Sequence, residues 1–241
     1  MPDGKKNVAL IANGDITCYS AAKERLAGTD YFIAVDGGLR HFRNLEVIPN
    51  VMLGDFDSAY PHVVERYNEQ GVLTLPFPEE KDATDLALAA AYTLTMNPAS
   101  IIILGALGGR LDHTLANLHV LGHINTQNGD IQAEIWDRDT VVNLVHPYSC
   151  CEIFFSFPRK AYKNLSLYPL GNRATGVTTR GLKYPLTNET LHAGETRGTS
   201  NIFDADTAEI SVESGLLLVI RSKPPQDPDE WTDEHGPIRP I

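Results

Sequence analysis

Four short motifs in the first half of the chain carry carboxylates and glycines at positions where ligands commonly bind. They are AVDGG at 34–38, GDFDS at 54–58, EKDATD at 80–85 and LGALGGRLDH at 104–113. In GDFDS, Asp55 and Asp57 stand two residues apart, so both carboxylates can face one hard cation. Mg²⁺ prefers one or two carboxylates together with water and phosphate oxygens, so this pair predicts a magnesium site. An Asp-rich turn without a ligand is the alternative that this motif alone leaves open.

Of the next two motifs, AVDGG stands at the end of a predicted strand and EKDATD at the start of a predicted helix. Glycines directly after a strand let a ligand approach the backbone closely. Aspartates at a helix start also stabilise the helix by capping it or by facing its dipole, so a structural role is the alternative for them. Lys81 in the second of these motifs is a candidate phosphate ligand. The residues of the two motifs with a candidate binding role are Asp36, Gly37, Gly38, Lys81, Asp82 and Asp85.

The last motif passes from an apolar run into a Gly-rich stretch and then into a helical pattern. A loop of this kind holds phosphates on its backbone N–H groups and on the start of the helix. The motif is neither GxxxxGK[ST] nor GxGxxG. Arg110 can neutralise charge on transferring phosphate oxygens. Asp112 can hold a second metal position, a ribose hydroxyl or Arg110, and helix capping is the alternative for it.

Elements that would position these motifs alternate through the first 140 residues. The apolar runs are 7–12, 31–36, 50–53, 71–76, 100–105 and 132–137, and the clearest helical patterns are 84–96 and 112–126. Continuous apolar strands between helices predict a mostly parallel, open, Rossmann-like sheet with helices on both faces. Around the second helix, Leu111, Leu115 and Leu118 form one apolar stripe.

Carboxyl ends of parallel strands share one edge of a sheet, and ligands bind there. Six aspartates fall at predicted strand ends or helix starts: Asp36, Asp55, Asp57, Asp82, Asp85 and Asp112. Gathered at one edge, these carboxylates would repel one another strongly without cations. Their convergence therefore predicts a divalent-metal site for a phosphate-bearing ligand.

The pattern changes after about Pro147, where short strands follow one another without a helix. The segments are 152–157, 164–170, 176–184, 190–194, 208–213 and 216–222. Short strands at this spacing predict a β-sandwich. We therefore expect an α/β domain over 1–146, an all-β domain over 147–222, and a Pro-rich acidic tail over 223–241.

Composition narrows the function classes. The 241 residues contain 20 Lys and Arg against 31 Asp and Glu, a formal charge of −11. This balance argues against nucleic acid or an anionic membrane as a partner. No apolar run approaches the roughly 20 residues that span a bilayer, and the three cysteines show no zinc or disulfide pattern. We expect a cytoplasmic protein. The pair His119 and His123 has no third ligand in reach and is interpreted as a solvent-exposed face.

In order and spacing, DGG, GDFDS, KDxTD and GxxGGRxDHxxAN resemble the thiamine pyrophosphokinase family. The second half agrees, since GLKYPL at 181–186, RGTSN at 197–201 and EISVESGLLLVI at 209–220 are similar to the carboxy-terminal β domain of that family. The resemblance runs from about Asp36 to Ile220. It implies that ATP and thiamine give AMP and thiamine diphosphate, with Mg²⁺, in a homodimer whose active site lies between subunits.

The resemblance also implies a role for individual residues. Asp55, Asp57 and Asp85 would hold Mg²⁺. The nucleotide would contact Asp36, Gly37, Gly38, Lys81, Gly108, Gly109, Arg110, Asp112, His113 and Asn117. Thiamine would contact Tyr184, Thr199, Ser200 and Asn201. Some relatives carry a Trp at the position of Tyr184, and a core tyrosine is the alternative for that residue.

The reaction requires the thiamine hydroxyl to attack the β-phosphorus while AMP leaves, which depends on positioning and charge neutralisation. We hypothesise that Asp82 or Asp112 orients or deprotonates the hydroxyl. The residues with catalytic roles would be Asp55, Asp57, Asp82, Asp85, Arg110 and Asp112. Two alternatives remain: a haloacid-dehalogenase-type phosphatase, because DFDS resembles its DxD motif, and a non-catalytic sensor of thiamine or nucleotide. Gly54 before the first Asp and Ser58 after the second depart from the phosphatase pattern.

Overall fold

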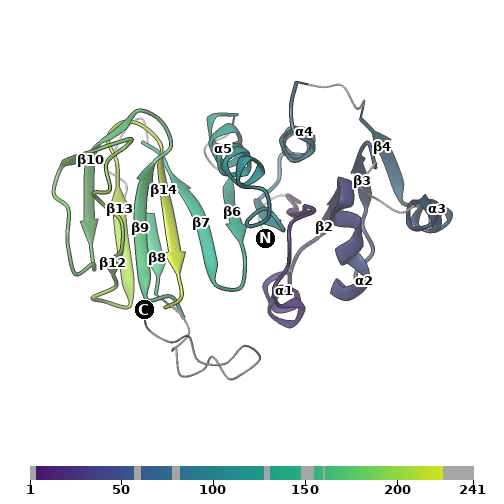
Figure 1. Ribbon diagram of the computed structural model, residues 1–241, viewed down its shortest axis with the longest axis horizontal. Helices are drawn as coiled ribbons and strands as arrows, with labels where there is room; N and C mark the ends of the chain where they lie inside the picture. Colours follow the sequence, from purple (N-terminus) through teal and green to yellow (C-terminus); the bar gives the residue numbers. More distant parts are fainter. Residues whose placement is uncertain are drawn as a thin grey trace, which may run out of the picture.

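A computed structural model describes residues 4–56, 61–77, 82–127, 131–147, 155–159 and 161–224. One long sheet runs across both halves of the molecule, with helices on the N-terminal half and a second sheet on the C-terminal half (Figure 1). Asp57 and Lys81, two of the predicted site residues, lie outside the described residues, as do Cys150, Cys151 and most of the predicted tail.

The long sheet has ten strands. In order across it they are β12 (Asn201–Ile202), β9 (Asn164–Pro169), β14 (Leu217–Ser222), β7 (Thr140–Val145), β6 (Gln132–Trp136), β5 (Ser100–Leu104), β1 (Asn7–Ile11), β2 (Tyr31–Val35), β3 (Val51–Gly54) and β4 (Leu73–Pro76). The six strands from β6 to β4 are parallel, and the remaining pairings are antiparallel. The chain runs outward from β1 to β4 and returns to β5 on the other side of β1, so the strand order reverses at β1.

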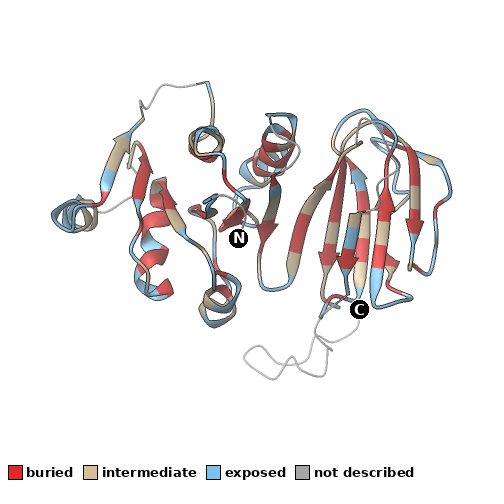
Figure 2. Ribbon diagram, turned by 180° about the vertical axis from the view of Figure 1, so that it is seen from behind, coloured by how far each residue is buried: buried red, intermediate tan, exposed pale blue. Residues whose placement is uncertain are grey.

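Helices cover both faces of the parallel strands because these strands are apolar on both sides. The helical segments are α1 (Tyr19–Arg25), the 3₁₀ helix η1 (Asp36–His41), α2 (Phe42–Leu45), α3 (Pro61–Glu69), α4 (Asp85–Thr95) and α5 (Leu111–Gln127). Ala9 and Ile11 of β1 share an apolar cluster with α1 and α2, whereas Val8 and Leu10 share one with α4 and α5. Figure 2 shows this burial concentrated along the central strands.

Helix α5 does not pack along the stripe that the sequence suggests. Leu111 and Leu115 are 71% and 54% exposed. Its buried residues begin at Asn117, so the helix meets the sheet only from that residue onward and its first turns extend past the sheet. Of the predicted apolar stripe, Leu111 and Leu115 therefore face solvent, and only Leu118 packs against the core. His119 and His123 are both exposed.

A second, antiparallel sheet is built from β11 (Glu189–His192), β10 (Arg173–Arg180), β13 (Thr207–Ser211) and β8 (Phe155–Pro158). Its apolar residues join those of β9 and β14 in one cluster. The fold is therefore α/β, with a large mixed sheet and a separate antiparallel sheet. The large sheet crosses the predicted boundary at 146, since β7 precedes it and β9, β12 and β14 follow it. Within the described residues, no helix is both long and apolar enough to span a membrane.

Candidate active site at the carboxyl ends of the parallel strands

Asp36 and Asp55 are brought together by neighbouring strands. β2 and β3 pair in parallel with Val35 opposite Leu53, so Asp36 and Gly54 lie level just beyond. A Cβ on Gly54 would lie 2.8 Å from the Cα of Asp36, closer than side chains tolerate. The glycine of GDFDS therefore lets the end of β3 lie directly against Asp36. We call the loops and helix starts that follow β1 to β5 the carboxyl edge.

Backbone strain marks the same place. Asp36 and Phe56 have φ angles of 47° and 59°, in the left-handed region. Asp adopts this conformation more readily than most residues, whereas a bulky Phe does so at a cost of about 1–3 kcal/mol. Strained backbone of this kind concentrates at binding and catalytic sites. Asp36 directly follows β2, and Phe56 lies two residues after the end of β3.

Helix α4 begins at the same edge because it follows β4 and runs back to β5. Thr84 caps it, its hydroxyl accepting a hydrogen bond from the N–H of Ala87 at 3.3 Å. Asp85 is the first helical residue and is half-buried, and Asp82 lies before the cap and is exposed. Thr84, and not Asp82, therefore caps the start of the helix.

In the Gly-rich loop after β5, the first glycine is tightly packed and the two glycines at the tip are accessible. Gly105, Gly108 and Gly109 have φ angles of 68°, 82° and 66°. A Cβ on Gly105 would lie 2.4 Å from the carbonyl oxygen of Ala12, whereas nothing lies within 4 Å of a Cβ on Gly108 or Gly109. The backbone at the tip of the loop is therefore accessible to a ligand.

Two side chains of α5 hold this loop. The amide nitrogen of Asn117 donates to the carbonyl of Ala106 at 2.9 Å, and the hydroxyl of Thr114 donates to the carbonyl of Gly108 at 3.1 Å. Asn117 is buried, so its amide nitrogen serves to hold the loop. Its contact with a nucleotide remains a prediction. Sequence reasoning did not find Thr114.

Arg110 and Asp112 pair at the start of α5. Their Nη2 and Oδ2 atoms are 2.6 Å apart, and Nε donates to Oδ1 at 3.2 Å. The N–H of the exposed His113 also donates to Oδ1, at 3.0 Å. The hydrogen bond from Arg110 lowers the pKa of Asp112, and that of Arg110 is raised in turn. Asp112 is the second helical residue, so it is not the cap, and Arg110 is its partner in this structure.

The turn after β1 completes the carboxyl edge, and sequence reasoning missed it. Gly14 donates its N–H to the carbonyl of Gly105 at 2.8 Å, and a Cβ on Gly37 would lie 2.4 Å from the side chain of Asn13. This turn lies where the strand order reverses, the position at which ligands bind to open α/β sheets. Its signal was available, since Asn13 and Gly14 follow the first apolar run as the other motifs follow theirs.

The predicted thiamine residues come together in the C-terminal half. The side chain of Asn201, 4% exposed, accepts from the N–H of Tyr184 at 3.1 Å and donates to its carbonyl at 2.7 Å. The N–H of Lys183 donates to the carbonyl of Ile202 at 2.9 Å. The segment around Tyr184 and the one around Asn201 are thereby held side by side.

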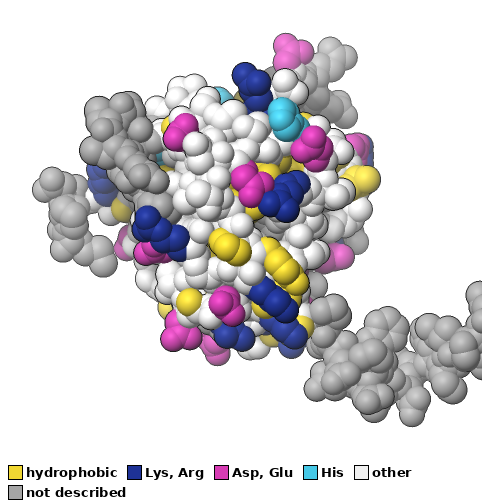
Figure 3. Space-filling model, turned by 90° about the vertical axis from the view of Figure 1, so that its left-hand side faces the viewer, with side chains coloured by type: hydrophobic (Ala, Val, Ile, Leu, Met, Phe, Trp, Pro, Cys, Tyr) yellow, Lys and Arg dark blue, Asp and Glu magenta, His cyan; other side chains and the backbone are white. Residues whose placement is uncertain are grey.

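The paired segments carry exposed side chains. Tyr184 is 57% exposed, so it is not the core tyrosine that was the alternative. Thr199 and Ser200 are also exposed, and Ser200 has a φ of 59°. Figure 3 views the end of the molecule formed by the C-terminal strands, where charges of both signs lie among a few hydrophobic side chains.

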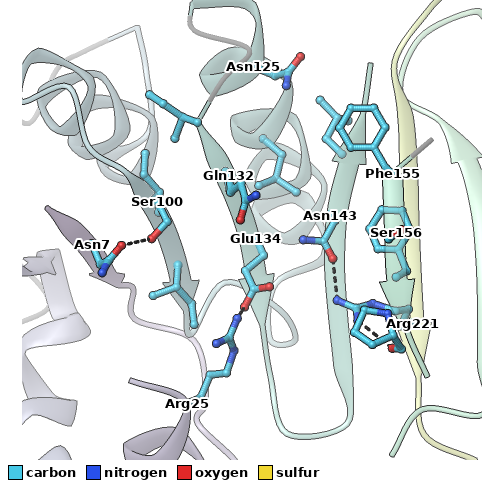
Figure 4. Close-up of a pocket in the computed structure, with 18 of the residues that line it drawn as sticks. Asn7, Arg25, Ser100, Asn125, Gln132, Glu134, Asn143, Phe155, Ser156 and Arg221 are labelled. Atoms are coloured by element: carbon cyan, nitrogen blue, oxygen red, sulfur yellow. Dashed lines mark hydrogen bonds and ion pairs between the residues drawn. The ribbon is translucent and has the colours of Figure 1, made fainter. Parts of the chain in front are cut away.

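A cavity of about 800 Å³ lies elsewhere, beside the amino ends of β1, β5 and β6. Figure 4 shows Arg25 paired with Glu134 and Arg221 bonded to Asn143 in its wall. None of the predicted site residues lines it. The candidate active site is therefore the open carboxyl edge and not this cavity.

The carboxyl edge suits a hard cation. Asp55 and Asp85 offer carboxylate oxygens, the donors that Mg²⁺ prefers, and Asp36 lies against the end of β3 beside them. Among the described residues no group of three or more His, Cys, Asp and Glu is placed to hold a metal ion. Asp57, predicted to complete the set, lies outside them. The carboxylate chemistry of Asp55 and Asp85 suits Mg²⁺, and the magnesium site stays a prediction.

Comparison with known proteins bears on both halves. The model described as "Thiamin pyrophosphokinase, catalytic domain" matches residues 22–133, and "Thiamin pyrophosphokinase, vitamin B1 binding domain" matches residues 153–217. The chain belongs to the thiamine pyrophosphokinase family. The carboxyl edge falls within the first match and the paired segments at Tyr184 and Asn201 within the second. The predicted family is confirmed, and the chain is an enzyme.

Individual relatives agree. Thiamine pyrophosphokinase 1 of Oryza sativa subsp. japonica is 31% identical over 179 residues, which is 71% of this chain and 66% of that protein. Thiamine pyrophosphokinase of Bacillus subtilis is 29% identical over 192 residues, 79% and 86% of the two chains. The B. subtilis crystal structure superposes with a TM-score of 0.77 at 28% identity, covering 90% of this chain and 99% of that one. Thiamin pyrophosphokinase from Candida albicans, at 19% identity, shares the fold with the same score over 91% of this chain and 90% of its own.

Proposed function

We propose that the chain carries out the thiamine pyrophosphokinase reaction of its family, moving the pyrophosphoryl group of ATP to the hydroxyl of thiamine with release of AMP. The accessible Gly-rich loop with Arg110 at the start of α5 carries the proposal that ATP binds at the carboxyl edge. Helix starts and free backbone N–H groups attract phosphate oxygens. The guanidinium of Arg110 adds donors that neutralise charge developing on the transferred group.

Magnesium would be held by Asp55 and Asp85, together with Asp57. When bound, it would neutralise charge on the phosphate oxygens of ATP. The protein's own contribution is to keep Asp55 at the end of β3 and Asp85 at the start of α4. Gly54 does so by letting the end of β3 lie against Asp36.

Orientation of the thiamine hydroxyl falls to Asp82 in this proposal. Asp112 is a weak proton acceptor, because its pairing with Arg110 lowers its pKa. Asp82 is exposed at the same edge and does not cap α4. If Asp82→Asn and Asp112→Asn both kept near wild-type kcat at saturating Mg²⁺, neither carboxylate would take part.

We further propose a homodimer in which thiamine bound at Tyr184 of one protomer meets the carboxyl edge of its partner. β12, which carries Asn201, and β2, which precedes Asp36, are seven strands apart in the ten-stranded sheet. At about 4.8 Å for each strand, that is about 34 Å along the sheet. Thiamine alone is shorter than this distance, which supports a site shared between two copies of the chain.

The domain assignment refines this picture. We interpret 1–146 as a Rossmann-like domain that binds ATP and Mg²⁺, and 147–222 as a β-sandwich that binds thiamine and forms the dimer. The strand reversal at β1 supports the first interpretation, and the shared apolar cluster of the two sheets supports the second.

Product analysis tests the reaction. Purified protein with ATP, Mg²⁺ and thiamine should give AMP and thiamine diphosphate in equal amounts on anion-exchange chromatography. ADP with thiamine monophosphate would instead show transfer of one phosphate, and the proposal would be wrong.

Complementation tests the shared site. Arg110→Gln damages the carboxyl edge and Tyr184→Ala the thiamine side, so each homodimer should be inactive. Refolded together in equal amounts, they should recover about a quarter of wild-type activity, because half the dimers are mixed and each mixed dimer holds one intact site. Arg110→Gln mixed with the double variant is the matched control and should recover nothing. Absence of recovery in the first mixture would place both halves of the site in one chain.

A further inference from the structure

The turn at Asn13 and Gly14 is wedged between two loops of the carboxyl edge. The N–H of Gly14 donates to the carbonyl of Gly105 at 2.8 Å, and a Cβ on Gly14 would lie 2.4 Å from that oxygen. On its other side, the amide of Asn13 fills the space in which a side chain at Gly37 would lie. Because the turn is tightly packed against both loops, a shift of the turn displaces both the Gly-rich loop and the loop after β2.

His41 is hydrogen-bonded to this turn. It ends η1, is 2% exposed, and its Nε2 lies 2.9 Å from the carbonyl oxygen of Gly14. A carbonyl only accepts, so Nε2 carries the hydrogen and donates it. The other nitrogen, Nδ1, then accepts from the hydroxyl of Tyr19 at 2.7 Å. Nε of Arg40 lies 3.3 Å from the same Nε2, which has no lone pair left to accept from it.

A second contact holds the neighbouring carbonyl. Nη2 of Arg40 donates to the carbonyl of Asn13 at 2.8 Å and to the carboxylate of Asp15 at 3.0 Å. On either side of this polar pair, Leu39 and Phe42 are buried. An apolar side chain at position 41 would fill the buried space, so packing alone does not account for the imidazole.

We propose that His41 is a positioning residue for nucleotide binding: fixed by Tyr19, it holds the Gly14 carbonyl and so sets the spacing of the Gly105–Gly109 and Asp36–Gly38 loops. The inference rests on the proposed binding of ATP at the carboxyl edge. His41 itself is too deeply buried to contact a ligand, and its effect on ATP passes through the turn.

Steady-state kinetics on the full-length enzyme test this role. His41→Leu removes both hydrogen bonds and should raise the KM for ATP about tenfold while leaving the KM for thiamine within about twofold. His41→Gln keeps a donor for the Gly14 carbonyl and should restore the KM for ATP to within about threefold of wild type. Tyr19→Phe removes only the hydroxyl, and keeps the test possible if His41→Leu does not fold. It should raise the same KM by about threefold.

Thr93→Val is the matched control, because Thr93 is fully buried in the last turns of α4 and its hydroxyl donates to the carbonyl of Ala89 at 2.7 Å. It should lower Tm without changing either KM. His41→Leu and Tyr19→Phe with lowered Tm and unchanged KM for ATP would show a purely structural role and overturn the proposal.

Arg110→Gln distinguishes failure of the His41 proposal from failure of the proposed ATP site. If it raises the KM for ATP and the His41 and Tyr19 variants do not, only the His41 proposal falls. If none of them raises it, ATP binds elsewhere and both proposals fall.

Discussion

Replacing Gly54 by alanine should separate the two carboxylates at the ends of β2 and β3. The new Cβ would lie 2.8 Å from the Cα of Asp36 and 3.0 Å from its Cβ. Carbon atoms in contact prefer about 3.5–4.0 Å, so the ends of β2 and β3 must move apart by about 0.7 Å or more. A misplacement of about 1 Å in an active site costs about 100-fold in rate. We therefore expect kcat to fall by up to about 100-fold.

Stability should fall much less. Overpacking of this kind costs about 1–3 kcal/mol, which for a domain of this size lowers Tm by about 2–4 °C for each kcal/mol. The variant therefore remains folded at assay temperature, and its loss of rate is measurable on native protein. Thermal unfolding followed by circular dichroism, beside steady-state kinetics with saturating substrates, gives both quantities.

Gly71→Ala is the matched control. Gly54 has a φ of 151° and Gly71 one of 79°, so alanine is conformationally disfavoured at both positions, but nothing lies within 4 Å of a Cβ on Gly71. It should lower Tm slightly and leave kcat within about twofold, since it displaces no part of the site. Wild-type kcat in Gly54→Ala, with a loss of Tm no larger than in Gly71→Ala, would refute the view that Gly54 sets the spacing of the carboxylates.

Three further predictions concern charge at and beneath the site. EDTA should abolish activity and Mg²⁺ restore it, and Asp55→Asn should raise the Mg²⁺ concentration for half-maximal rate by about tenfold or more; an unchanged titration would exclude Asp55 as a ligand. Burial and Arg40 lower the pKa of His41 from its ordinary 6.5. The unfolded chain then binds this proton at higher pH than the folded one, so the stability from neutral His41 is present above about pH 6.5 and is lost as pH falls below it. Tm should therefore drop more steeply in wild type than in His41→Gln between about pH 7 and 5.5, and equal slopes would contradict the assignment. In Arg110→Gln the pKa of Asp112, followed by carboxyl NMR, should rise towards its ordinary value, because its pKa is lowered mainly by the hydrogen bond from that guanidinium; an unchanged pKa would mean that another group holds it down.

Much of the fold could be predicted because strands buried on both faces have a strong signature. The apolar runs at 7–12, 31–36 and 100–105 correspond to β1, β2 and β5 within a residue. β7 and the two-residue β12 were missed. β12 pairs with β9, which lies 36 or more residues away, and local pattern does not carry such a contact. β7 pairs with β14, 72 or more residues away, but also with the preceding strand β6, so a local hairpin signal was available for it.

Two of the three residues of the predicted stripe on α5, Leu111 and Leu115, do not pack against the core, whereas Leu118 does. Periodicity says which residues share a face of a helix, and it does not say how much of the helix lies over the sheet. Leu111 and Leu115 belong to turns that extend past the sheet towards the Gly-rich loop, so their side chains face solvent.

The candidate site was foreseen where a motif follows a strand, as for Asp36, Asp55 and Arg110. Sequence did not reveal which role each carboxylate takes, because capping, pairing and ligand binding use the same residue types. The structure shows Thr84 as the cap of α4 and Arg110 as the partner of Asp112. Nor did sequence reveal His41, because its contact with Gly14 joins residues 27 positions apart.

The unbroken ladder from β5 through β6 and β7 to β14 leaves a protomer without a hinge between its two halves. In the proposed dimer, each protomer then moves as one rigid body, with the carboxyl edge at one end and the thiamine surface at the other. Rotation of one protomer relative to its partner about the two-fold axis opens or narrows both active sites by the same amount. Substrate binding that closes one site would therefore also close the other, so binding at one site would change the substrate affinity of both.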